Sequence, residues 1–412
     1  MRDGHGLSGE ATEATVVIVG IGDDGWPGLT SEAQAVLRDA VVIAGGGRQL
    51  VLLPDLRARR IPLPSPLLEQ LDGLIAANPD LCLLASGDPM LHGIGATLAR
   101  RLGPGRIRVL PAVSSVALAC SRLGWAEHEV DVVSVLSRPP AAILPAVQPG
   151  ARLLVLCRDG GTPAALAALL ADRGWAPTRV TVLEHLGGPA ERVRGPYPAG
   201  SPEPGPFADL CLAALACEPD AADRVLPRVP GLPDGAYETD GQLTRREVRA
   251  AALAALAPGP GQVLWDVGAG SGSIGIEWMR TDQRCRAIAV EARPDRADLL
   301  ERNATRLGVP GLEIIRGVAP DALAGLARPD AVFVGGGLTA DGVVEACWEA
   351  LPPGGRLAAH AVTVESEAVL QQWQRTVGGQ MVKLAVSYQA PLGRFTTWRP
   401  ALPVTQWQVN KP

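Results

Sequence analysis

The stretch from Leu264 to Met279, LWDVGAGSGSIGIEWM, constrains the fold more than any other part of the chain. An apolar run ending at Val267 predicts a buried strand, and glycines at 268, 270 and 272 allow positive φ and close approach of a ligand. Apolar residues at helical spacing follow, so we expect a helix to begin directly after the glycines. This order of strand, glycine-rich turn and helix indicates a nucleotide-type cofactor loop in an α/β domain.

Glu291 closes the next apolar run, 19 positions after Gly272. A carboxylate at this place can accept both ribose hydroxyls of an adenosine. The loop itself reads Asp266-Val-Gly-Ala-Gly-Ser-Gly, and an acid ahead of the glycines would repel a pyrophosphate but suits the cationic part of S-adenosylmethionine. The loop therefore resembles motif I of class I methyltransferases. The alternative is a glycine turn that only lets a helix cross a strand.

Composition limits the classes of protein to which the chain can belong. Its 412 residues are 47% apolar and 20% charged, which is typical of a compact protein of two or three domains. The net charge of -5 argues against a nucleic-acid partner. Seven scattered cysteines without a CxxC pair predict buried thiols, and no metal site is expected. A polar, acidic start and the lack of a long charge-free run predict a cytoplasmic protein that does not bind membranes.

The first half of the chain alternates strand and helix patterns. Thr15 to Gly20 predicts a buried parallel strand, and the loop GIGDDGWPGLT follows it, although two aspartates make that loop a poor phosphate site. Thr30 or Ser31 is expected to cap the next helix. Strands and helices then alternate, while 195–206, rich in proline and glycine, is expected to be a surface excursion.

Three motifs in this half carry a family resemblance: VGIG at 19–22, SGDPMLHG at 86–93 and PAVSSV at 111–116. They resemble the tetrapyrrole methylases, class III S-adenosylmethionine enzymes, over roughly 15–218. The resemblance implies two α/β lobes that bind a folded S-adenosylmethionine between them. Two features depart from the pattern. The first loop continues as GIGDDGWPGLT in place of the family's usual proline-containing continuation, and His92 stands where the family usually has Tyr. The cofactor-binding residues that the resemblance implies are Gly87, Asp88, Gly93, Ile94, Ser114 and Ser115.

A proline-rich stretch separates the two halves. We expect a flexible tail at 1–14, a first domain at 15–218, a linker at 219–236 and a second domain at 237–412. In the second domain Thr244 and Glu247 have the spacing of a capping box at the start of a helix. Tryptophans 278, 348 and 373 are expected in the core.

The segment 231–400 resembles the decarboxylating methyltransferase domain of cobalamin synthesis, whose T-x-x-E-V-R motif is matched at 244–249. The resemblance implies that Gly335 to Gly337 line the far side of the cofactor. His360 stands in a segment that usually reads NAVT, and both acid-base work and packing are open to it. The cofactor-binding residues implied here are Thr244, Gly268, Ala269, Gly270, Ser271, Gly272, Glu291 and Ala319.

The fold class that these resemblances imply is α/β, with a class III tetrapyrrole methylase of two α/β lobes followed by a Rossmann-like class I methyltransferase domain. Two unlike methyltransferase modules in one chain resemble the two-domain decarboxylating methyltransferases of corrin synthesis. The resemblance implies two methylations of precorrin-6B with loss of a ring acetate carboxyl, giving precorrin-8. It also implies S-adenosylmethionine as cofactor with one site in each domain, a tetrapyrrole substrate and a homo-oligomer.

Four arginines, 245, 246, 249 and 316, are candidates for binding substrate carboxylates, although surface roles are open to them too. Three other functions remain open at this point. The chain can be two fused methyltransferases that act on unrelated small molecules. Its second domain can be a dinucleotide-dependent reductase. Its first module can be a degenerate scaffold without activity.

Overall fold

The computed structural model describes residues 15–64, 66–201, 205–220 and 225–412, so the predicted tail at 1–14 lies outside the described residues. Two compact units emerge. The N-terminal unit comprises 15–136, 152–168 and 178–216, and the C-terminal unit comprises 137–151, 169–177 and the described residues from 217 onward. Both units combine β-sheets with helices, which confirms the predicted α/β class.

The first sheet of the N-terminal unit is entirely parallel, with the strand order β3-β2-β4-β1-β5. Its strands are β1 (Val16–Ile21), β2 (Val42–Gly45), β3 (Arg59–Pro62), β4 (Leu81–Ser86) and β5 (Ile107–Leu110). The connecting helices are α1 (Ser31–Asp39), α2 (Gly47–Val51), α3 (Leu67–Ala77) and α4 (Ile94–Leu102). The nearly continuous apolar strands β1 and β4 are buried, as parallel strands covered on both faces must be. Thr30 caps α1 by accepting from the Ala33 amide at 3.2 Å, as predicted.

The second sheet of this unit is mixed, with the order β6-β7-β10-β8-β9. Helix α5 (Ser115–Leu123) precedes it, and α6 (Thr162–Asp172) follows its second strand. The strands are β6 (Val130–Ser134), β7 (Arg152–Leu156), β8 (Arg179–Glu184), β9 (Arg192–Pro198) and β10 (Cys211–Ala216). The expected surface excursion at 195–206 is wrong for its first residues, because 195–198 belong to β9. An edge strand pairs on one side only, so it tolerates the prolines of this segment.

The C-terminal unit holds a seven-stranded sheet in the order β13-β12-β11-β14-β15-β19-β16. The first five strands in this order are parallel, and β19 runs antiparallel to both of its neighbours. The strands are β11 (Val263–Val267), β12 (Arg286–Glu291), β13 (Glu313–Arg316), β14 (Ala331–Val334), β15 (Arg356–Ala361), β16 (Gln380–Leu384) and β19 (Val404–Asn410). Glu291 therefore closes β12, as the sequence predicts.

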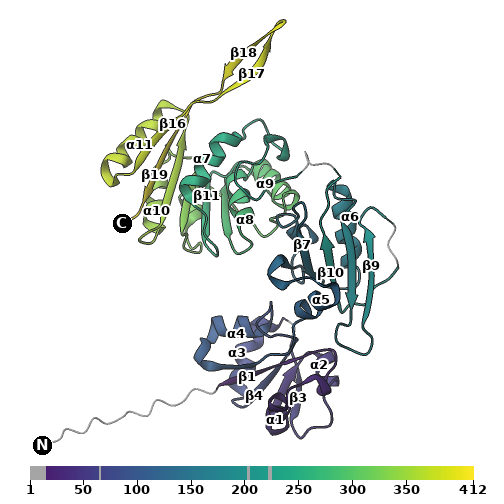
Figure 1. The fold of residues 1–412 in the computed structure, drawn as a ribbon. Coiled ribbons are helices and arrows are strands. Elements are labelled where there is room, and N and C mark those ends of the chain that lie inside the picture. Colours follow the sequence, from purple (N-terminus) through teal and green to yellow (C-terminus); the bar gives the residue numbers. More distant parts are fainter. Residues whose placement is uncertain (1–14, 65, 202–204, 221–224) are drawn as a thin grey trace, which may run out of the picture. The chain divides into compact units, whose positions relative to one another are not determined.

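Helices cover both faces of this sheet (Figure 1). On one face lie α7 (Arg246–Leu256), α8 (Ser273–Thr281) and α9 (Pro294–Arg306), which share a core with Leu264 and Phe333. On the other face lie α10 (Val343–Ala350) and α11 (Val364–Val377), which pack with Trp265 and Trp407. Trp278 is fully buried, and Trp348 and Trp373 pack against the second core, so their predicted core role is confirmed.

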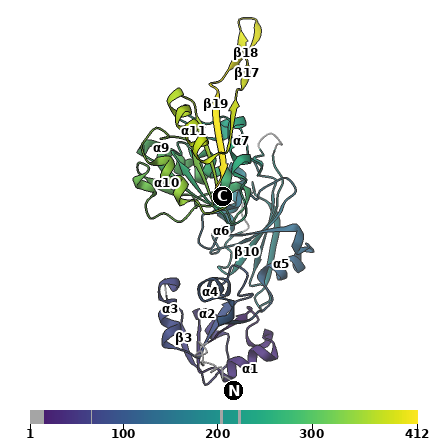
Figure 2. The same ribbon diagram turned by 90° about the vertical axis from the view of Figure 1, so that its left-hand side faces the viewer.

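A β-hairpin leaves the edge of the C-terminal sheet and extends away from it (Figures 1 and 2). Its strands are β17 (Ser387–Leu392) and β18 (Phe395–Pro400), which pair with each other between β16 and β19 in the chain. Leu392, Phe395 and Trp398 on this hairpin are each more than 60% exposed. The sequence analysis did not anticipate this element.

The start of α7 differs from the prediction. The helix begins at Arg246 with Arg245 as its N-cap residue, and no side chain caps it. The Thr244–Glu247 capping box is therefore wrong. Glu247 instead accepts a hydrogen bond from the Tyr388 hydroxyl of β17 at 2.7 Å, a contact across 141 positions that local spacing does not encode.

Two further expectations bear on the cysteines and on membranes. Six of the seven cysteines are buried, and Cys211 is half-buried. Within the described residues, none of the helices combines the length and apolar character needed to cross a bilayer.

Candidate functional site

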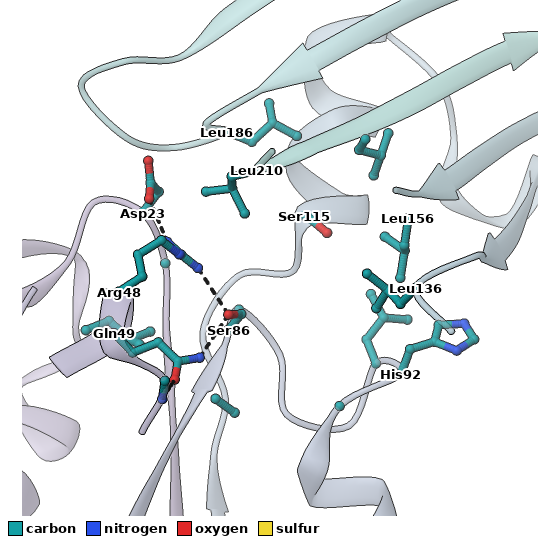
Figure 3. Close-up of a pocket in the computed structure, with 18 of the residues that line it drawn as sticks. Asp23, Arg48, Gln49, Ser86, His92, Ser115, Leu136, Leu156, Leu186 and Leu210 are labelled. Carbon is teal, nitrogen blue, oxygen red and sulfur yellow. Dashed lines mark hydrogen bonds and ion pairs between the residues drawn. The ribbon is translucent and has the colours of Figure 1, made fainter. Parts of the chain in front are cut away.

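A cavity of about 490 Å³ opens in the N-terminal unit, at the carboxyl ends of the first sheet's strands. Its volume lies in the range typical of small-molecule sites, about 300–1,000 Å³. Leucines from the second sheet and its loops form one side, among them Leu156, Leu186 and Leu210 (Figure 3). Polar side chains that follow β1, β2 and β4 form another side. The cavity thus joins an apolar wall to a short polar one.

Gly20 explains why three strand ends converge beneath this cavity. A Cβ atom at Gly20 would lie 2.6 Å from the Ala112 nitrogen and would also overlap the Gly87 carbonyl oxygen. The Gly87 amide donates to the Ile21 carbonyl at 2.9 Å, so β1 continues into close contact with the turn after β4. The first glycine is therefore needed for packing of the strand ends, and not for binding a phosphate.

The predicted cofactor residues of this unit divide into two groups. Gly87, Gly93, Ile94 and Ser115 line the cavity. Asp88 does not line it; its Oδ1 accepts from the Met90 amide at 2.8 Å and holds the turn. Ser114 also does not line it, because its Oγ accepts from the Ala117 amide at 3.0 Å and caps α5. His92 lines the cavity with a φ of 52°, a conformation uncommon for residues other than glycine.

The polar wall consists of residues that the sequence analysis did not single out. Arg48 donates to Asp23 at 2.6 Å and to the Ser86 hydroxyl at 3.1 Å, and Gln49 donates to the same hydroxyl at 2.9 Å (Figure 3). The other oxygen of Asp23 is 3.0 Å from Nδ1 of His185, which follows β8. An arginine three residues after the end of β2 was the signal that could have pointed to this wall.

The glycine turn of the C-terminal unit has the predicted backbone. Gly268, Gly270 and Gly272 all have positive φ, at 70°, 57° and 79°. A Cβ atom at Gly268 would lie 2.7 Å from Gly336, and one at Gly272 would lie 2.6 Å from Leu300. At Gly270, none of the described residues other than its two chain neighbours has an atom within 4 Å of that position. Two of the glycines thus permit packing, and the middle one leaves an open cradle that a ligand can occupy.

Glu291 lies against this cradle. Its carboxylate accepts from the Gly270 amide at 2.7 Å and from the Arg293 amide at 2.9 Å, and the residue is 5% exposed. These two bonds fix the carboxylate at the carboxyl end of β12, beside the turn. A carboxylate held there suits the ribose hydroxyls of an adenosine, so the residues present fit the adenosine part of S-adenosylmethionine.

Asp266 does not have the place that its sequence position suggested. It is 1% exposed, and its Oδ2 accepts from the Gly275 amide at 2.8 Å within the first turn of α8. The expectation that it faces a cationic ligand is therefore wrong, because its side chain points into the core rather than along the loop. Burial, with a further contribution from Glu291, raises the pKa of this carboxyl to about 7.

Of the remaining residues implied for this site, Gly335 and Gly336 lie against the turn. Gly335 donates to the Val267 carbonyl at 2.9 Å, and the next glycine touches Gly268. Ser271 is buried, and its carbonyl accepts from Asn303 at 3.1 Å. Ala319 packs at the edge of the second core. The Thr244 carbonyl accepts from Arg249, and its side chain caps no helix.

His360 is a buried imidazole near the end of β15. Its ring packs edge to face on Phe333, with the two ring centroids 4.9 Å apart, and Nε2 is 2.9 Å from Oε1 of Gln406. The amide nitrogen of Gln406 donates to Gln408 at 2.7 Å, so its oxygen is the acceptor and the proton of His360 lies on Nε2. Burial lowers the pKa of His360, which favours the neutral imidazole.

The four candidate arginines do not share one surface role. Arg249 is fully buried and donates to Glu277 and Asp234, each at 2.8 Å, so its expected contact with substrate is wrong. Glu277 also accepts from the Gly231 and Leu232 amides, which ties this network to the chain ahead of α7. Local spacing cannot reveal a partner 28 positions away. The three others are at least partly exposed: Arg245 pairs with Asp234, Arg316 pairs with Asp298, and Arg246 opens α7.

Comparisons with known proteins match both halves of the chain. Residues 15–198 match the family model of tetrapyrrole (corrin/porphyrin) methylases, and residues 235–411 match that of the precorrin methyltransferase domain. A precorrin-6Y C(5,15)-methyltransferase [decarboxylating] from Sinorhizobium sp is 46% identical over 402 residues, 96% of each chain. One from Mycobacterium tuberculosis is 45% identical over 407 residues, 96% of this chain and all of that one.

A shorter relative matches part of the chain. The probable cobalt-precorrin-6B C(15)-methyltransferase (decarboxylating) of Pyrobaculum calidifontis is 34% identical over 182 residues. The match covers 42% of this chain and 93% of that relative. The name of this relative, whose length is about that of one domain, thus includes both C(15) methylation and decarboxylation.

Proposed function

The chain belongs to the family of precorrin-6Y C(5,15)-methyltransferases (decarboxylating) of cobalamin biosynthesis, and we propose that it performs this reaction with one S-adenosylmethionine site in each half. The observation that carries the second site is the open cradle at Gly270 beneath the fixed carboxylate of Glu291. The cavity of the N-terminal unit supports the first site. The proposed substrate is precorrin-6B and the proposed product is precorrin-8.

The chemistry asks for little acid-base machinery from the protein. S-adenosylmethionine supplies an electrophilic methyl group when bound, and a bridging carbon of a reduced tetrapyrrole is enamine-like and already nucleophilic. Holding two reacting groups in line at about 3 Å can supply much of the acceleration. The apolar wall of the cavity, with Leu156, Leu186 and Leu210, suits this task because it excludes water and offers a hydrophobic contact surface.

We assign the C(15) methylation and the decarboxylation to the C-terminal unit, and the C(5) methylation to the N-terminal unit. Support comes from the short archaeal relative, whose description names C(15) and decarboxylation and whose length is about that of one domain. The match of 235–411 to the precorrin methyltransferase domain favours the C-terminal half for this pair of activities.

The C-terminal unit also contains the group that we propose for proton transfer after decarboxylation. Gln406 holds the ring proton of His360 on Nε2, and burial lowers the pKa of the ring, so His360 would act as a relay: Nδ1 takes up a proton from solvent and passes it to the carbon left by decarboxylation. His360 stands near the carboxyl end of β15, in a parallel array. His360→Asn keeps a polar side chain but removes the titrating ring, so we expect decarboxylation to fall more than C(15) methylation. His128→Asn, at an exposed position of the N-terminal unit, is the control. Equal loss of both reactions in His360→Asn would contradict this role.

We further propose a homo-oligomer. The hairpin of β17 and β18 exposes Leu392, Phe395 and Trp398, and a two-stranded hairpin is at best marginally stable alone in water. Contact between copies would cover these side chains. Light scattering during gel filtration measures the mass directly. Phe395→Ser with Trp398→Ser should lower the mass toward that of one chain, and a wild-type protein that elutes as a monomer would end the proposal.

The proposed reaction is tested with purified protein, precorrin-6B and S-adenosylmethionine carrying a ¹³C methyl group. The expected product gains two labelled methyl groups and releases carbon dioxide. Carbon NMR places each methyl group, and mass spectrometry counts them. Failure to transfer a methyl group, with a substrate that a family member converts in parallel, would refute the function.

A further inference from the structure

On the polar wall of the N-terminal cavity, the side-chain oxygens already accept hydrogen bonds, whereas several N–H and O–H groups remain available to donate. The Gln49 oxygen accepts from the Gly46 amide at 2.6 Å, so its amide nitrogen points to Ser86. The Ser86 oxygen accepts from both Gln49 and Arg48, which leaves its hydroxyl proton to donate elsewhere. Both oxygens of Asp23 are engaged, one by Arg48 and one by His185.

Arg48 is the side chain on this wall with donors to spare. A guanidinium carries five N–H donors, and the described residues take one for Asp23 and one for Ser86. Its side chain is 38% exposed, whereas that of Asp23 is 12% exposed. The ion pair and the hydroxyl fix the direction of the guanidinium, so its remaining N–H groups are preorganised toward the cavity that the residue lines.

A wall of donors requires a ligand that accepts hydrogen bonds. Asp23 and Arg48 are the charged residues among the described residues that line the cavity, and each oxygen of Asp23 already has a partner, Arg48 for one and His185 for the other. A cationic ligand group would therefore have to compete with Arg48 and His185 for this carboxylate. A carboxylate could accept two parallel hydrogen bonds from the guanidinium and a third from the Ser86 hydroxyl, and arginine commonly binds carboxylates in this bidentate way.

We propose that Arg48 binds a carboxylate group of a ligand in this cavity, with the Ser86 hydroxyl as a second donor and Asp23 as the residue that positions the guanidinium. The identity of the carboxylate rests on the proposed function. It belongs either to an acetate or propionate side chain of the tetrapyrrole or to the methionine part of the cofactor. The apolar wall opposite accepts the rest of either molecule.

Arg48→Gln in the full chain tests this inference, with Arg108→Gln as the matched control. Arg108 also forms an ion pair, with Glu32 at 2.6 Å, but it is outside the cavity lining. Three quantities are measured for each variant: the KM for precorrin-6B in the formation of each methylated product, the affinity for S-adenosylhomocysteine, and the affinity for 5′-methylthioadenosine, which lacks the amino-acid carboxylate. Calorimetry resolves the affinities, and the cofactor site of the C-terminal unit serves as the internal reference.

A carboxylate of the tetrapyrrole predicts a roughly 10- to 100-fold rise in KM for one methylation, with kcat and S-adenosylhomocysteine binding retained. A carboxylate of the cofactor predicts a similar weakening of S-adenosylhomocysteine at one site, with 5′-methylthioadenosine unchanged. Arg48→Lys keeps the charge without the fork and should give a smaller change in the same quantity.

The inference is overturned if none of the three quantities differs from the control, or if S-adenosylhomocysteine and 5′-methylthioadenosine weaken equally. The second result would mean that Arg48 only shapes the cavity. Thermal unfolding of each variant shows whether it is folded. If Arg48→Gln is destabilised, the same measurements are made on Arg48→Lys instead. Failure of the proposed function has a different signature, because wild-type protein would leave precorrin-6B unmethylated. The two binding measurements alone would then decide the role of Arg48.

Discussion

Replacing Asp266 by Asn should stabilise the C-terminal unit, most strongly above pH 7, with a gain that shrinks as the pH falls and vanishes below pH 3.8. Asp266 is completely enclosed beneath the glycine turn, and no cation among the described residues pairs with it. Its Oδ2 accepts one backbone amide, from Gly275, and an asparagine oxygen can accept the same bond. The substitution therefore removes a titrating charge while it keeps the size of the side chain and its hydrogen bond.

The magnitude follows from the pKa. Burial raises the pKa of Asp266 from 3.8 to about 7, so the folded chain keeps a proton that the unfolded chain releases above pH 3.8. The stability that this proton supplies is fully present below pH 3.8 and is lost as the pH rises to about 7. Across that window the loss approaches about 4 kcal/mol, an upper limit, at about 1.4 kcal/mol for each pH unit. Above pH 7 the penalty is constant.

Thermal unfolding followed by tryptophan fluorescence from pH 5 to pH 8.5 measures this effect. The Asp266→Asn midpoint should exceed that of the wild type by a few degrees near pH 5, and the difference should grow to roughly 5 °C or more by pH 7 and then stay constant to pH 8.5, since about 1 kcal/mol moves the midpoint of a domain of this size by about 2–4 °C. Asp298→Asn, at an exposed carboxylate of α9, is the control and should show no such trend. A midpoint difference that does not depend on pH would refute the reasoning.

Three further substitutions test the two sites and the cores beneath them. Glu291→Ala should abolish one methylation and weaken S-adenosylhomocysteine at one site by roughly 10-fold or more, while Glu301→Ala leaves both; loss of both methylations would contradict separate sites. Gly20→Ala should lower the unfolding free energy by more than about 2 kcal/mol because its Cβ meets the backbone, while Gly47→Ala, in open space, should be nearly neutral in the same urea titration. Arg249→Met should lower the free energy of unfolding by about 3–5 kcal/mol because it leaves the buried carboxylate of Glu277 without its cation. Arg302→Met, at an exposed ion pair, should lower it by less than about 1 kcal/mol, and equal losses would count against the buried network.

Side-chain direction is where prediction from the sequence failed. Asp266 and Glu291 both lie in strands of the same sheet near the glycine turn, and spacing alone placed both beside the ligand. In the structure Glu291 meets the turn at its open glycine, while Asp266 caps the first turn of α8 from below. Arg249 differs in the same way, because a helix that packs over β14 and β15 turns this arginine inward toward Glu277.

By itself, the sequence determined the elements and the turn. The run from Leu264 to Met279 specifies strand, glycine turn and helix because hydrophobic period and positive φ are properties of adjacent residues. Tertiary structure alone decided which distant groups meet. Asp23 and His185 lie 162 positions apart, yet they share a hydrogen bond and so orient Arg48 in the cavity. The added strands β16 and β19, with the hairpin between them, likewise depend on long-range pairing. Such contacts depend on how packed sheets bring strand ends together, and no local pattern records that geometry.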